Sequence, residues 1–198
     1  MNRGTAVAAV ALAAALLAGC GATSPAGTVA VVGGARIGYA SVQARVAELR
    51  SAAATGSGDA TGEADGLARR AVAELVLDAL LAGALADHGL TVTDGEVAAA
   101  RAAERQRLGG EEQLERALIR QGVPAGRIDT YYRRQLAVGG LAAADGQDAG
   151  TPSGQVAVRR ALAAAAGGRH VRINPRYGSW DAGRASLAPD APLWLTAG

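Results

Sequence analysis

The one cysteine of this 198-residue chain, Cys20, follows directly on an apolar segment near the N-terminus. Arg3 places a positive charge before residues 5–17, a run made almost entirely of Ala, Val and Leu. That run is shorter than the roughly 20 apolar residues of a permanent membrane helix, and its order of charge, apolar run and small residues is typical of a secretion signal. Because a thiolate is a strong nucleophile, the Cys20 side chain can be alkylated. The sequence therefore predicts an export signal over residues 1–19, followed by a thiol available for covalent modification.

The four residues Leu17-Ala18-Gly19-Cys20 match the bacterial lipobox at every position. This resemblance implies transfer of a diacylglyceryl group to the Cys20 thiol and cleavage between Gly19 and Cys20. Two acyl chains anchor a protein stably where one chain would be marginal. We therefore expect a lipoprotein that is held by lipid at the extracytoplasmic face of the cell membrane, with residues 20–27 as its tether. The alternatives are an ordinary secretion signal in which the cysteine stands by chance, and a cysteine buried as an apolar side chain.

The remaining chain holds few side chains suited to catalysis or metal binding. A single cysteine excludes an internal disulfide and a multi-thiolate zinc or iron–sulfur site. Of the two histidines, His88 is expected at a helix end, and His170 opens a short predicted strand with no acid or nucleophile beside it in sequence. Neither an H-E-x-x-H nor a G-x-S-x-G motif occurs. We therefore expect no enzyme, no bound metal and no cofactor.

Charge is nearly balanced along the chain, with 20 basic residues, all of them arginine, against 18 acidic ones and a net charge of +2. So small an excess does not indicate nucleic acid as a partner, and export makes nucleotide partners improbable. The C-terminal part is the basic one. Its arginines either face anionic headgroups or cell-wall polymers, or form a solvated rim; they are Arg159, Arg160, Arg169, Arg172, Arg176 and Arg184.

The mature chain begins with a predicted β-hairpin. Residues 28–32 have strand composition, residues 35–37 can form the return strand, and Gly33-Gly34 allows the positive φ of a tight turn between them. A helix is expected to follow from Gly38, as its N-cap, to about residue 54.

The strongest helical pattern covers residues 67–87, where Val72, Val76 and Leu80 form one stripe that neighbouring leucines widen. A helix apolar around most of its girth is expected to be the central one. Thr93 and Glu96 then form a capping box at the start of a largely solvated helix that ends at Leu108.

The rest of the chain also reads as helical, and the fold class predicted is mainly α. We expect helices over residues 111–121, from the Gly122-Val123-Pro124 corner to about 144, and over 155–166, with loops at 55–65 and 145–154, a strand at 170–173 and an irregular tail at 183–198. Trp180 is expected to plug the small core, whereas the sequence does not place Trp194.

In its order of elements, the chain resembles the N-terminal domain of SurA-type periplasmic foldases. The hairpin VAVVGGARI, the long apolar helix, the T-x-x-E helix and the Gly-x-Pro corner occur in the order of that family. The segment HVRINPRYGSWD resembles its closing strand and matches a familiar ending of actinobacterial SurA-like lipoproteins. The resemblance covers residues 28–182 and implies a small helical domain with a short β-hairpin closed by a C-terminal strand.

The resemblance also implies a function. SurA-type enzymes carry a parvulin isomerase of around ninety residues between the helical part and the closing strand, whereas here only residues 145–154 are available. We therefore expect chaperone-like binding of unfolded or newly exported polypeptides without prolyl isomerisation. The alternative, from another class, is a structural or adaptor lipoprotein that binds one folded partner of the cell envelope.

Apolar side chains on the later helices are the candidates for contact with a polypeptide, because surplus apolar surface on a helical scaffold binds exposed hydrophobic segments. The same side chains could instead fill the small core. The candidate residues are Leu114, Leu118, Tyr131, Tyr132 and Leu136.

Overall fold

The computed structural model describes residues 27–55 and 64–188. The described part is 69% helix with short antiparallel strands, so the predicted mainly α fold class is confirmed. Several sequence predictions concern residues outside this part: the export signal, the lipobox residues Leu17, Ala18, Gly19 and Cys20, most of the tether, and Trp194.

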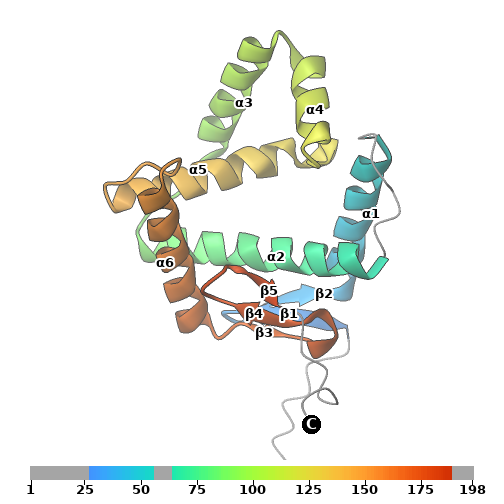
Figure 1. The fold of residues 1–198 in the computed structure, drawn as a ribbon, viewed down its shortest axis with the longest axis vertical. Helices are drawn as coiled ribbons and strands as arrows, with labels where there is room; N and C mark the ends of the chain where they lie inside the picture. Colours follow the sequence, from blue (N-terminus) through green and yellow to red (C-terminus); the bar gives the residue numbers. More distant parts are fainter. Residues whose placement is uncertain (1–26, 56–63, 189–198) are drawn as a thin grey trace, which may run out of the picture.

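The described part of the chain runs from a hairpin through six α-helices to four short C-terminal elements (Figure 1). The first half holds β1 (Thr28–Val32), β2 (Ala35–Gly38), α1 (Tyr39–Thr55), α2 (Ala64–Asp87), α3 (Asp94–Leu108) and α4 (Glu111–Arg120). The second half holds η1 (Ala125–Arg127), α5 (Ile128–Ala144), α6 (Pro152–Arg169), β3 (Arg172–Ile173), η2 (Pro175–Tyr177), β4 (Ser179–Asp181) and β5 (Ser186–Ala188).

The hairpin and its closing strand form a three-stranded antiparallel sheet in the order β2-β1-β3. Gly33 and Gly34 have φ of 57° and 86°, which an L side chain adopts only with strain, so the predicted glycine turn is confirmed. β3 pairs with β1 through Ala30 opposite Ile173, and the closing strand is therefore confirmed as well. It is shorter than expected because His170 ends α6 in the left-handed conformation instead of opening the strand.

Helix α2 is the centre of the main core, as its apolar girth predicted. Val72, Val76 and Leu80 are fully buried, and α1, α5, α6, β1 and β5 all pack against α2. At about 25 cal/mol per Å² of apolar surface, burying each of these side chains contributes on the order of 2 kcal/mol. The remaining space is filled largely by alanines of α5 and α6, which let these helices approach one another closely.

A second, smaller core lies where the hairpin of α3 and α4 meets the start of α5. It consists of Val97, Leu114, Leu118, Ile128 and Tyr132. Figure 1 shows the α3–α4 hairpin projecting from one side of α5, at the end of the molecule opposite the sheet. Thr93 caps α3 with both reciprocal bonds of the predicted capping box, which is confirmed.

We expect the α3–α4 hairpin to depend on Leu114 for its stability. Because this side chain is 0% exposed, Leu114→Ala leaves a cavity and should lower the free energy of unfolding by about 3 kcal/mol. Hydrogen exchange should speed up in α3 and α4 more than in α2, since the two cores are separate. Val156→Ala, at a side chain that is 52% exposed, is the control and should change stability by less than about 0.5 kcal/mol.

Helix α6 extends further than the sequence indicated at both ends, and the predicted bounds were wrong. It begins at Pro152, because the Thr151 side chain accepts a hydrogen bond from the Gly154 amide and caps it. It continues through Gly167-Gly168 because Arg169 is fixed from outside the helix, donating to both carboxylate oxygens of Asp87 at 2.6 and 2.8 Å. Arg169 crosses α2 at Gly83, where a Cβ atom would lie 2.2 Å from its Nε atom. These contacts outweigh the weak helix propensity of glycine.

The tail expected to be irregular from residue 183 contains a strand. β5 pairs with β4, so that Trp180 lies opposite Leu187. The reason is tertiary: Leu187, Ala185 and Trp180 pack against the main core, which orders a segment whose local composition gives no strand signal. Trp180 is partly buried there, in keeping with the expected plug.

Candidate polypeptide-binding site

An apolar groove lies between the C-terminal half of α2, the segment that follows it and the middle of α5. We call it the α2–α5 groove. Its volume is about 660 Å³, within the range of pockets that bind small molecules or several side chains. It is lined by Asp78, Leu81, Ala82, Leu85, Ala86, Gly89, Leu90, Thr91, Val92, Thr130, Arg133, Arg134 and Ala137.

The floor of the groove is made by aliphatic side chains that only partly belong to the core. Leu85, Leu90 and Val92 are partly buried and pack against core residues, while Ala82 and Ala86 on α2 are exposed. The spacing of four residues places Ala82 and Ala86 on the same side of α2. Small side chains at these two positions leave the groove open toward the solvent.

Two ion pairs border the groove on the α5 side. Arg134 donates to Asp78 of α2 at 3.0 and 2.7 Å. Arg133 donates to the Val92 carbonyl at 3.0 Å and to the Asp94 carboxylate at 2.5 Å. An apolar floor with a charged border suits an extended polypeptide, because apolar side chains can enter while its backbone stays near polar groups.

Asp78 also belongs to a partly buried ion network that joins α1, α2, α5 and η1. At its centre, Arg45 is 3% exposed and donates to Glu74 at 2.7 Å. Its guanidinium lies 3.3 Å from Glu48 and 3.7 Å from Asp78. Each of the three carboxylates has a second arginine: Arg127 for Glu48, Arg70 for Glu74 and Arg134 for Asp78. The network fixes α5, and with it one wall of the groove, to α1 and α2.

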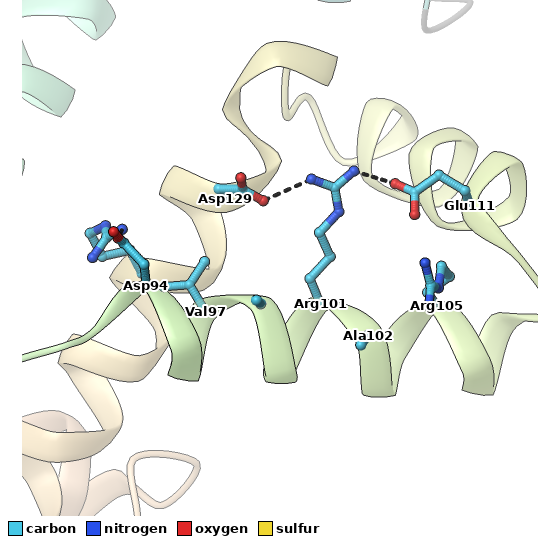
Figure 2. A pocket seen from close by; sticks show the side chains of 9 residues that line it. Asp94, Val97, Arg101, Ala102, Arg105, Glu111 and Asp129 are labelled. Atoms are coloured by element: carbon cyan, nitrogen blue, oxygen red, sulfur yellow. Dashed lines mark hydrogen bonds and ion pairs between the residues drawn. The ribbon is translucent and has the colours of Figure 1, made fainter.

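A smaller and more polar hollow of about 240 Å³ lies beneath the α3–α4 hairpin. Figure 2 shows Arg101 of α3 between Asp129 of α5, at 2.8 Å, and Glu111 of α4. The hydrogen bond to Glu111, followed by that to Asp129, raises the pKa of Arg101. Because Arg101 of α3 binds one carboxylate of α4 and one of α5, we interpret this cluster of ion pairs as the contact that holds the hairpin to α5.

The comparison with protein families decides what kind of domain this is. A family model described as the SurA-like N-terminal domain matches residues 4–142. The chain belongs to the SurA-like N-terminal domain family. No curated protein and no solved structure shows a significant match to it.

Membership of the SurA-like N-terminal domain family assigns the chain to a group of chaperone-related periplasmic folding factors and suggests binding of polypeptide substrates. The matched residues include α1 to α4 and all but the last two residues of α5, and so both walls of the α2–α5 groove. Helix α6 and strands β3 to β5 follow the matched part, yet they complete the sheet and the main core.

The five binding residues predicted from the sequence of this SurA-like domain do not line the groove. Leu114, Leu118 and Tyr132 are buried in the second core, in agreement with the alternative prediction that these side chains fill the core. Tyr131 and Leu136 are partly buried against the same core, and the Tyr131 ring meets Tyr132 edge to face at 5.3 Å. Burial raises the pKa of Tyr132, whose hydroxyl has no partner among the described residues.

Sequence reasoning missed the residues that do line the groove. Leu81 and Leu85 are among the leucines that widen the apolar stripe of α2, and Leu90 and Val92 follow the end of that helix. The one available signal was the excess of leucine on α2, which is apolar on more faces than one contact with the core requires.

No further chemistry-bearing group stands out in the part of the chain that the structure describes. Its helices include none that is long and apolar enough to cross a membrane. Within residues 27–55 and 64–188, no three residues among His, Cys, Asp and Glu are grouped so that they could hold a metal ion. His88 follows the end of α2, as expected, and His170 borders an open hollow beside Trp180.

Proposed function

We propose that this protein is a lipid-anchored chaperone of the extracytoplasmic space that binds unfolded or newly exported polypeptides in the α2–α5 groove. The observation that carries the proposal is an apolar groove of about 660 Å³ inside a SurA-like domain. Its affinity would come from burying apolar side chains of the client against Leu85, Leu90 and Val92, and such burial needs no ATP.

We further propose that the protein has no prolyl isomerase activity. In the structure, only residues 145–151 separate α5 from α6. A connection of this length is too short to hold a parvulin domain of around ninety residues, which supports the proposal.

The proposed location depends on the lipobox. Acylation of Cys20 would hold the domain near the membrane at which exported chains emerge. The groove and the anchor can be tested separately, because the groove is formed by α2 and α5 whereas the anchor depends on the sulfur atom of Cys20.

Placing charge in the groove is expected to weaken client binding. In Ala82→Glu/Ala86→Glu, the two exposed alanines that line the groove become carboxylates. A bound client would desolvate them at a cost of about 2 kcal/mol, which weakens binding about 30-fold. The measurement is suppression of the aggregation of an unfolded client by the purified protein, monitored by light scattering, together with the affinity for a fluorescent apolar peptide.

Ala99→Glu/Ala164→Glu is the matched control, because both alanines are exposed on helices outside the groove. It should suppress aggregation as the unmodified protein does, with the thermal stability of both variants measured alongside. If the unmodified protein fails to suppress aggregation even at large molar excess, it is not a holding chaperone. Crosslinking in cells distinguishes the chaperone from the adaptor alternative. Crosslinks to many unrelated polypeptides support the chaperone, whereas crosslinks to one folded partner in stoichiometric amount support the adaptor.

A further inference from the structure

The outer face of the three-stranded sheet carries a row of two arginines with a valine between them. In the register of the sheet, Val31 of β1 lies opposite Arg36 of β2 on one side and Arg172 of β3 on the other. Residues directly opposite one another in antiparallel strands have side chains on the same face of the sheet. We call this row the Arg36–Arg172 face.

The opposite face of the sheet is the buried one. Ala30 lies opposite Ile37 and Ile173, is 1% exposed, and packs with them in the main core. Since neighbouring residues of a strand point to opposite faces, the Arg36–Arg172 face must point away from the core. Both arginines are accordingly exposed, and Val31 is partly exposed.

The charge of this face is not neutralised. Among the described residues, neither Arg36 nor Arg172 forms an ion pair. Two other basic residues of the C-terminal part differ in this respect, since Arg169 is bound by Asp87 and Arg160 by Asp145. A protein that leaves two guanidinium groups on one sheet face without partners keeps them available for an external anion.

The excess of positive charge extends over this end of the molecule. Residues 27–38 and 170–188, which contain the five strands of the described part, hold four arginines and a single acid, Asp181. One of these arginines, Arg176, is exposed and lies over the Tyr177 ring at 5.3 Å. By contrast, the α3–α4 hairpin at the other end of the molecule carries acids and arginines in similar numbers.

We propose that the Arg36–Arg172 face lies on the anionic phospholipid headgroups of the membrane. β1 begins at Thr28, eight residues after Cys20, and eight extended residues reach at most about 28 Å. The sheet, and not the α3–α4 hairpin, is therefore the end of the domain nearest the proposed lipid. This orientation rests on the anchor under Proposed function, whereas the charge of the face does not.

The strength of this contact follows from the charges. A basic side chain at an anionic membrane surface strengthens binding about fivefold, so the two arginines together contribute about 30-fold. At about 1 M salt the Debye length falls to about 3 Å, and the contribution should vanish. On phosphatidylcholine, which carries no net charge, the two arginines should not strengthen membrane binding.

The absence of lysine from the sequence allows a direct test. Arg36→Lys keeps the charge and introduces a single side-chain amine at position 36. The full chain is reconstituted into vesicles of phosphatidylcholine with or without phosphatidylglycerol, and the rate of amine acetylation at position 36 is followed by mass spectrometry. We expect acetylation at least about fivefold slower on phosphatidylglycerol vesicles, with the rate restored at high salt. Arg120→Lys, on exposed Arg120 of α4, is the matched control and should react at the same rate on both.

Further outcomes separate this face from the anchor. Arg172→Glu in the Arg36→Lys background should remove the protection, since it reverses the neighbouring charge. Equal rates on the two vesicle types, equal protection at position 120, or protection by a soluble anionic cell-wall polymer but not by vesicles would each overturn the proposal. If the chain dissociates from phosphatidylcholine vesicles, the lipid anchor is contradicted. If position 36 is still protected from acetylation on vesicles with phosphatidylglycerol in that case, the proposal for the Arg36–Arg172 face remains supported.

Discussion

Replacing Arg45 by alanine is expected to lower the free energy of unfolding by about 3 kcal/mol, the lower end of the cost of breaking a buried ion pair. Arg45 is 3% exposed, and its guanidinium lies between Glu48, Glu74 and Asp78. Removal of the Arg45 side chain leaves a cavity, and the three carboxylates around that cavity lose the positive charge between them. The cost stays at the lower end because each carboxylate retains a second arginine at the border of the network. Chemical denaturation monitored by circular dichroism measures the change.

A surface pair provides the comparison for this variant. Arg116 and Glu112, one helical turn apart on α4, form an exposed ion pair at 2.7 Å. Arg116→Ala should change stability by no more than about 0.5 kcal/mol, because solvent screens such pairs. If Arg45→Ala costs no more than Arg116→Ala, Arg45 does not stabilise the packing of α1 against α2. A double-mutant cycle with Glu74→Gln should give a coupling energy of about 1 kcal/mol or more.

The Cys20→Ala variant should lose acylation and leave the membrane fraction. The sulfur atom is the acceptor of the proposed diacylglyceryl group, and a methyl group cannot replace it. Without two acyl chains, no stable anchor remains. Fractionation of cells that express the variant, with mass spectrometry of the N-terminal peptide, measures both effects.

Thr23→Ala, three residues further on, is the control and should stay with the membrane. Cys20→Ser provides a second comparison, since a hydroxyl group also cannot form the thioether. Unchanged membrane fractionation of Cys20→Ala, or native protein with a free thiol and residues 1–19 still attached, contradicts the anchor. The stability of the domain should be the same in all three variants, because the two cores lie within residues 27–188.

The amino-acid sequence by itself determined the local elements. The Gly33-Gly34 turn, the capping box of Thr93 and Glu96, and the apolar girth of α2 were each predicted and each confirmed. Their physical causes act over a few residues: positive φ, two reciprocal hydrogen bonds, and a helical repeat of apolar side chains. For the same reason the order of elements was enough to identify the family.

The tertiary structure alone decided what those elements present to one another. Leu114 and Leu118 form the apolar side of an isolated helix whether that side meets a client or a core, and only the approach of α3 and α5 settles that it is a core. Arg45 has a helical spacing that does not reveal its burial, because the carboxylates around it come partly from α2.

The same reason applies to the Arg36–Arg172 face, whose two arginines are 136 positions apart in the chain. Neither local pattern nor charge density predicts that both lie beside Val31, because pairing of β3 with β1 brings them together. Contacts between distant segments depend on how whole elements pack, and that information is spread over the complete chain. The chemistry of single residues could be inferred from the local sequence, whereas the residues that surround each of them in space are determined by the tertiary fold.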